Sequence, residues 1–292
     1  MRKDTKIKFI DERVAKADEI QKKHRVAGFT YAVVKKYSDD RGGHLAALLT
    51  YYGFLSIFPL LLVSSAIIQI LSFSDDELRT KIINYATQYF PILGEHLQTQ
   101  LHNLASTKAV LIVSILITLW GAKGIADIFQ FSLNQVWDVP HPERPGFAKR
   151  SLKSIGIIFL AGGGFIVAAF LSGYAAGINQ DIIFRVISIL ISISVLFCVF
   201  WALFKWGLAG PKNYKEQALV RSAIVAAIGI QFLQIVGGYV VTRQLKHLNL
   251  FYGSFGITLA LLFWIYLQAQ VVIYAAEVGS VYDKRKWPRD LK

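Results

Sequence analysis

The sequence has few of the residues that build disulfides, metal sites or nucleotide-binding loops. Cys198 is the single cysteine among 292 residues, which excludes a disulfide within the chain and a cysteine-based metal cluster. The six histidines are scattered without the spacing of a metal site, and the chain has no Gly-Lys-Ser/Thr loop to hold a phosphate. We therefore predict no catalytic residues, no metal and no cofactor, and no ATP-driven transport by this chain alone.

Charged residues are also scarce. Asp, Glu, Lys and Arg make up 17% of the chain, whereas 54% of it is hydrophobic. Soluble globular domains are typically about 25% charged. The first 45 residues are strongly charged, so we expect no cleavable signal peptide. This composition predicts an all-α, polytopic membrane protein.

Six apolar runs are long enough to cross a bilayer core of about 30 Å as helices that rise about 1.5 Å per residue. They cover approximately residues 45–71, 109–133, 155–178, 182–205, 218–241 and 253–280, with a short link at Arg243 and Lys246 before the last run. Residues 73–108 are too polar to span, but their leucines recur at helical spacing, which predicts an extracytoplasmic amphipathic helix. The predicted organisation is a basic amphipathic segment at 1–44, a six-helix transmembrane domain at 45–280 and a basic tail at 281–292.

Lys and Arg concentrate in four of the seven segments outside the apolar runs: the N-terminal segment, the second and fourth loops, and the C-terminal segment. Because cytoplasmic loops of membrane proteins are enriched in Lys and Arg, this asymmetry predicts cytoplasmic N and C termini. It also accounts for the net charge of +13 without nucleic acid. We therefore expect membrane lipids, and not nucleic acid, as partners.

The last apolar run carries one formal charge, Glu277. Tyr274, Gln270 and Tyr266 precede it at helical intervals and share its face. A carboxylate at the bilayer centre costs about 2.5 kcal/mol or more, so this face is expected to contact protein or a watery cavity. Two interpretations are open: a functional surface, or an acid near the helix end that reaches the lipid headgroups without a further role. The predicted topology places Glu277 toward the cytoplasmic end, beside the end of the second run.

A second polar stripe lies in the run at 109–133. Lys123 and Asp127 are four residues apart and can pair on one helical face, which Gln130 and Asn134 continue. The pair is either a structural ion pair or a substrate-binding or proton-linked pair.

Three residues of the first run, Tyr52, Ser56 and Pro59, share a third polar face. Proline interrupts the run, because it leaves a backbone carbonyl without its helical partner. This face either lines a cavity or marks a kink that serves packing alone.

Three separated segments occur in the order expected for a known family. They are AALLTYYGFLSIFPLLL (46–62), LWGAKGIADIFQFSLNQVWDV (119–139) and FYGSFGITLALLFWIYLQAQVVIYAAEVGSVYD (251–283), and together they resemble the YihY/BrkB family of bacterial inner-membrane proteins. The resemblance implies a multi-pass protein of the bacterial cytoplasmic (inner) membrane. Some members carry an old ribonuclease BN label, which the scattered histidines of this chain do not support.

These features favour a transporter or flippase that moves a lipid or other amphiphile through a polar cavity between the first, second and sixth spans. In this hypothesis Lys123 and Lys205 attract an anionic headgroup, while Asp127 and Glu277 balance charge or carry a proton. The alternative is a non-transporting envelope scaffold or assembly protein, in which the polar stripes only join helices. A membrane enzyme acting on headgroups would need a catalytic constellation, and none is recognisable.

Overall fold

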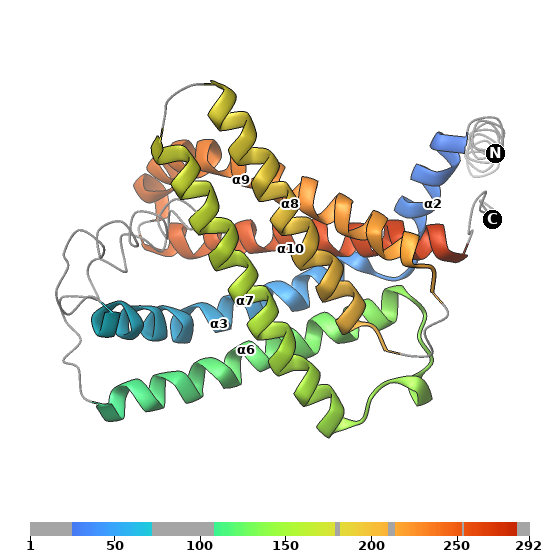
Figure 1. The fold of residues 1–292 in the computed structure, drawn as a ribbon, viewed down its shortest axis with the longest axis horizontal. Coiled ribbons are helices and arrows are strands. Elements are labelled where there is room, and N and C mark those ends of the chain that lie inside the picture. Colours follow the sequence, from blue (N-terminus) through green and yellow to red (C-terminus); the bar gives the residue numbers. More distant parts are fainter. Residues whose placement is uncertain (1–24, 72–107, 179–181, 210–213, 253, 285–292) are drawn as a thin grey trace, which may run out of the picture.

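The computed structural model describes residues 25–71, 108–178, 182–209, 214–252 and 254–284, and every regular element in these ranges is helical (Figure 1). This confirms the predicted all-α fold. The elements are α2 (Arg25–Asp39), α3 (Gly42–Leu71), α6 (Lys108–Val136), the short 3₁₀ helix η1 (His141–Glu143), α7 (Phe147–Ile178), α8 (Ile182–Gly207), α9 (Glu216–Tyr252) and α10 (Ser254–Lys284).

Most helices coincide with the predicted apolar runs to within a few residues, but α7 begins eight residues before its run, at Phe147 instead of residue 155, and the end of α9 differs more. Helix α9 continues through Arg243 and Lys246 to Tyr252, where a link was predicted. That prediction was wrong because it rested on charge alone; residues 241–252 contain no glycine or proline to end the helix. The predicted amphipathic segment 73–108 lies outside the described residues.

The first span is also more regular than predicted. Its helix α3 is continuous across Pro59, so the expected interruption is absent from this helix. The side chain of Pro59 lies outside the described residues, as do residues 1–24 of the N-terminal segment.

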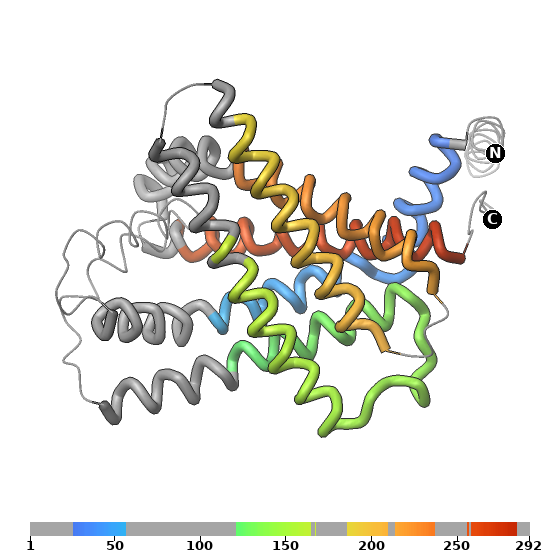
Figure 2. The backbone as a smooth tube through the Cα atoms, viewed as in Figure 1, coloured from blue at the N-terminus to red at the C-terminus, as the bar shows by residue number. Residues whose placement is uncertain are grey.

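The helices form two sets that cross. Figure 2 shows α3, α6 and α10 running alongside one another, while α7 and α8 cross them at a steep angle. The last helix, α10, packs along α9 and also contacts α2, α3 and α6. It is therefore the element that joins most of the bundle.

Three helical segments within the described residues are long and apolar enough to cross a membrane: Val186–Gly207, Glu216–Val236 and Thr258–Lys284. The helices α3, α6 and α7 are 30, 29 and 32 residues long, enough for a bilayer core at about 1.5 Å per residue. Large apolar side chains such as Phe159 and Phe232 are exposed on the outer faces, as expected where lipid covers a protein. The chain is thus a helical membrane protein, and the count of six spans stays a prediction.

The ends of several helices meet on one side of the bundle. Lys284 Nζ at the end of α10 donates to the carbonyl oxygen of Trp137 just after α6 (2.7 Å). Lys215 N–H, just before α9, donates to Asp283 Oδ1 (2.8 Å). We call this side, where α6, α8 and α10 end and α9 begins, the basic end, because the predicted cytoplasmic loops with many Lys and Arg lie there. Its cytoplasmic location stays a prediction.

Candidate functional site

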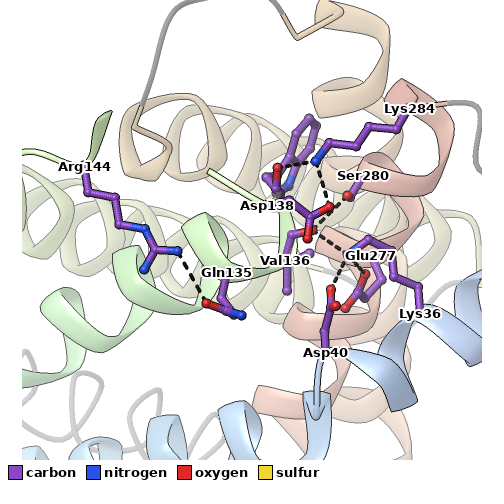
Figure 3. Close-up of polar contacts among 10 residues, drawn as sticks. Lys36, Asp40, Gln135, Val136, Asp138, Arg144, Glu277, Ser280 and Lys284 are labelled. Atoms are coloured by element: carbon purple, nitrogen blue, oxygen red, sulfur yellow. Dashed lines mark hydrogen bonds and ion pairs between the residues drawn. The ribbon is translucent and has the colours of Figure 1, made fainter. Parts of the chain in front are cut away.

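A buried charge cluster joins α2 to α10 at the basic end. Lys36 of α2 and Glu277 of α10 are both 0% exposed, and Lys36 Nζ lies 3.1 Å from Glu277 Oε2. Lys36 also pairs with Asp40, one turn further along α2. Its third contact is with α6, where Lys36 Nζ donates to the carbonyl oxygen of Val136 (2.6 Å). The same carbonyl oxygen accepts a hydrogen bond from Ser280 Oγ of α10 (2.8 Å) (Figure 3). Three helices therefore converge on one ammonium group.

The charges of this cluster do not balance. One ammonium faces two carboxylates, and Asp40 is only 15% exposed. Neither oxygen of Glu277 accepts a hydrogen bond of normal geometry from the described residues, although the ion pair with Lys36 is close. Buried carboxylates are normally satisfied by several donors. The Lys36–Asp40–Glu277 cluster can therefore take up one more proton or accept one more hydrogen bond.

Tyrosine side chains flank the cluster. The rings of Tyr37 and Tyr274 stack with centroids 3.9 Å apart and planes 5° apart. Burial, followed by the influence of Tyr274, Tyr266 and Glu277, raises the pKa of the Tyr37 hydroxyl to about 12, so this phenol keeps its proton at physiological pH. A Cβ on Gly43 would lie 3.7 Å from the Tyr266 hydroxyl and 3.8 Å from that of Tyr37, which places both hydroxyls near the start of α3.

A second polar network joins α6 to α7. Asp127 Oδ2 lies 3.3 Å from Lys123 Nζ, and Asp127 Oδ1 accepts a short hydrogen bond from the Ser154 hydroxyl of α7. Arg150 Nε lies 3.7 Å from the same Oδ1, and Gln130 Nε2 donates to Ser154 Oγ (2.8 Å). The predicted pair at Lys123 and Asp127 thus exists, and it is part of the contact between these two helices.

Asn134 extends this stripe to the end of α8. Its Oδ1 accepts the backbone N–H of Ala209 (2.8 Å), and its Nδ2 donates to the carbonyl oxygen of Gln130 (2.7 Å). Nearby, Lys153 Nζ donates to the carbonyl oxygen of Leu208 (2.9 Å). These bonds fix the chain where α8 ends.

We expect Asn134→Leu to lower the free energy of unfolding by about 1–2 kcal/mol, because a buried N–H at Ala209 loses its acceptor. Unfolding in detergent followed by circular dichroism measures the effect. Gln135→Leu, on the exposed side of the same helix, is the control and should change stability by about 0.5 kcal/mol or less. Equal effects of the two substitutions would contradict the assignment.

The predicted site residues separate into different contacts. Tyr52 packs on α6, since a Cβ on Gly124 would lie 2.7 Å from its ring, and the Ser56 hydroxyl lies 3.0 Å from the carbonyl oxygen of Gly121. Tyr266, Tyr274 and Glu277 face α2 and the start of α3, as described above, and Gln270 is half-buried on α10. The α6 stripe instead faces α7 and α8. The predicted site residues therefore form two separate groups, one on α10 and one on α6.

Glu277 lies beside the end of α6, as the topology predicted. Its complete burial does not fit the interpretation that it reaches the lipid headgroups. Lys205 pairs with Glu216 (2.6 Å) and lies 4.6 Å over the Trp201 ring, and its attraction for a headgroup stays a prediction. Among the described residues, no group of three or more His, Cys, Asp or Glu is arranged to hold a metal ion.

Sequence reasoning missed the partner of Glu277. Lys36 belongs to the segment predicted as a basic amphipathic helix, and its charge was used only as evidence of topology. A signal was present, however: Ala32 and Val33 are buried apolar residues one turn before Lys36, on the same face of α2. That spacing places the lysine on the packed face.

Comparison with known proteins agrees with this membrane fold. Residues 33–291 match the family described as Virulence factor BrkB. Similar proteins include the ribonuclease-like protein YfkH of Bacillus subtilis strain 168 (25% identical, covering 88% of this chain and 96% of that protein). Inner membrane protein YhjD of Escherichia coli K12 is 23% identical over 94% of this chain and 86% of its own length. No solved structure matches the chain significantly. Since the family match extends over most of its length, this chain belongs to the BrkB family of membrane proteins.

Proposed function

We propose that the chain is an inner-membrane transporter or flippase for a lipid or another amphiphile, and that the Lys36–Asp40–Glu277 cluster couples substrate movement to the binding of a proton or a cationic group. The observation that carries this proposal is the ion pair between Lys36 and Glu277, both fully buried at the junction of three helices. The name of YhjD, an inner membrane protein, supports the choice of membrane.

The physical argument begins with desolvation. Removing two charges from water is so costly that a buried ion pair is often no more stabilising than apolar residues of the same size. An ionisable pair inside a membrane protein is therefore by default a functional hypothesis. Stability alone gives no reason to place Lys36 and Glu277 here.

The net charge of the cluster suggests how it works. The cluster has two carboxylates and one ammonium, so one added positive charge makes it neutral. If that charge neutralises Glu277, Lys36 keeps Asp40 as its partner. The attraction between α2 and α10 then weakens. In this proposal α2 moves away from α10 and exposes the tyrosine hydroxyls of Tyr37 and Tyr266, which are suited to hydrogen-bond a polar headgroup.

We expect Glu277→Gln to slow lipid movement at least about tenfold, which corresponds to about 1.4 kcal/mol in the barrier. The amide keeps the size of the side chain but fixes it in the neutral form, so the cluster can no longer alternate between the paired and the released state. The measurement is the rate at which a fluorescent phospholipid moves between the leaflets of liposomes that contain the purified protein.

Glu216→Gln is the matched control. It removes the same charge from an ion pair at the same end of the bundle, but Glu216 is 62% exposed and its pair with Lys205 is accessible to water. This variant should move lipid at the unaltered rate. If Glu277→Gln moves lipid at the rate of the unaltered protein, the proposal is contradicted.

The α6–α7 network favours the second candidate, a scaffold or envelope-assembly protein. Asp127 and Gln130 contact residues of α7 rather than an open path, as expected of side chains that only join helices. Neutralising Lys123 or Asp127 separates the two roles. Loss of stability with unchanged lipid movement assigns these residues to structure, whereas loss of lipid movement at unchanged stability assigns them to transport.

A further inference from the structure

The surface where α6 meets the start of α7 combines exposed apolar rings with unbalanced positive charge. Phe147 is 72% exposed, and Phe131, on the face of α6 that carries Lys123 and Asp127, is 42% exposed. Arg150, at 45% exposure, lies within the same stretch of α7 as Phe147. A surface of this kind fits a molecule with an anionic head and apolar chains.

The charge is unbalanced because one carboxylate faces two cations. Asp127 binds Lys123 at 3.3 Å and the Ser154 hydroxyl, while Arg150 Nε stays 3.7 Å away, beyond hydrogen-bond distance. Among the described residues, the Arg150 guanidinium has no other hydrogen bond or ion pair. A guanidinium has five N–H donors, and its planar fork fits phosphate oxygens. Its donors are therefore free for an anion.

Aromatic rings hold the neighbouring cations beside this apolar surface. Lys123 Nζ lies 5.0 Å from the centroid of the exposed Phe147 ring, and the Arg144 guanidinium lies 5.7 Å from that of Phe131, which is 42% exposed. Cations are attracted to ring faces, and long basic side chains reach from apolar surfaces toward headgroups. The exposed Lys149 adjoins Arg150 and adds a further positive charge.

We infer that this surface binds an anionic phospholipid, with its phosphate at Arg150 and Lys123 and its apolar chains against the exposed Phe147 and Phe131 rings. Charge complementarity selects this occupant over a zwitterionic lipid, because Lys123, Arg150 and the ionised Asp127 together leave one net positive charge, before Lys149 is counted. Binding here does not require translocation. The site therefore stands or falls separately from the proposed transport.

The test compares phosphatidylglycerol with phosphatidylcholine of identical acyl chains, bound to the full chain in detergent and counted by native mass spectrometry. The unaltered protein should bind phosphatidylglycerol about fivefold more tightly, the factor expected from one net positive charge near the headgroup. The preference should weaken as ionic strength rises, because salt screens exposed charges.

Arg150→Gln should abolish most of this preference, whereas Lys215→Gln, which removes an exposed cation elsewhere at the basic end, should retain it. Lys123→Gln is the second variant, in case the loss of Arg150 disturbs folding, and it should also lose the preference. Equal binding of the two lipids by the unaltered protein would overturn the inference, and so would a preference that survives both substitutions. A change of oligomeric state in Arg150→Gln without a change in lipid preference would also overturn it, since the surface would then be an interface between copies.

Discussion

Lys36→Met is expected to lower the free energy of unfolding by about 3–5 kcal/mol, the usual effect of removing one partner of a buried ion pair. The substitution leaves Glu277 as a buried carboxylate without its cation and removes the donor to the carbonyl oxygen of Val136. Methionine fills a similar volume, so lost packing contributes little. Unfolding in mixed micelles, followed by circular dichroism, measures the change.

The double variant Lys36→Met, Glu277→Gln separates charge from packing. It removes the two fully buried charges and leaves only the partly exposed Asp40 without its cation, so it should recover part of the stability lost in the single variant. Lys205→Met is the surface control: its pair with Glu216 is 46% and 62% exposed, and exposed pairs contribute about 0–1 kcal/mol. If Lys36→Met is no more destabilising than Lys205→Met, the burial of the pair is contradicted.

The same double variant bears on function. A protein that regains stability but moves no lipid needs the charged pair for transport. One that regains stability and moves lipid normally uses the pair only to dock α2, which is the scaffold interpretation. The stability cycle and the liposome assay are therefore informative together.

The sequence predicts most of the helix layout for a simple reason. In hydrocarbon, backbone N–H and C=O groups must bond within the segment, so a long apolar run becomes a helix whatever its neighbours. Contacts along one helix can also be predicted from sequence. The spacing of Lys123 and Asp127 predicted their ion pair, which the structure contains. The predicted end of α9 was wrong because charged residues can continue a helix beyond an apolar run without breaking it.

The topology predicted that Glu277 lies beside the end of α6, but the side-chain partners between helices were beyond sequence reasoning. Ser154 meets Asp127 across 27 residues of chain, and Ala209 meets Asn134 across 75. No local pattern states which face of one helix meets which face of another. The Lys36–Glu277 pair spans an even greater separation and was found only through the packing of α2 on α10.

The second large effect is expected at Gly279, where α10 packs closely against α9. A Cβ at this position would clash with the Ser222 hydroxyl, lie 2.8 Å from the backbone oxygen of Ala218 and lie 3.0 Å from the Trp137 ring. The serine can rotate, but the backbone of α9 cannot move without separating the helices. Small residues permit such close contact between membrane helices, and alanines line much of this one.

We therefore expect Gly279→Leu to destabilise the protein by about 3 kcal/mol, at the upper end of the usual cost of overpacking. Gly162→Leu on α7 is the matched control: nothing lies within 4 Å of a Cβ built there, and replacing a helical glycine should change stability by about 1 kcal/mol or less, in the favourable direction. Because Gly279 lies between Glu277 and Ser280, the leucine also displaces the face of α10 that contacts α2 and α6. Lipid movement should then fall in Gly279→Leu even at temperatures where the protein remains folded, and the same loss in Gly162→Leu would contradict this link between helix packing and the charge cluster.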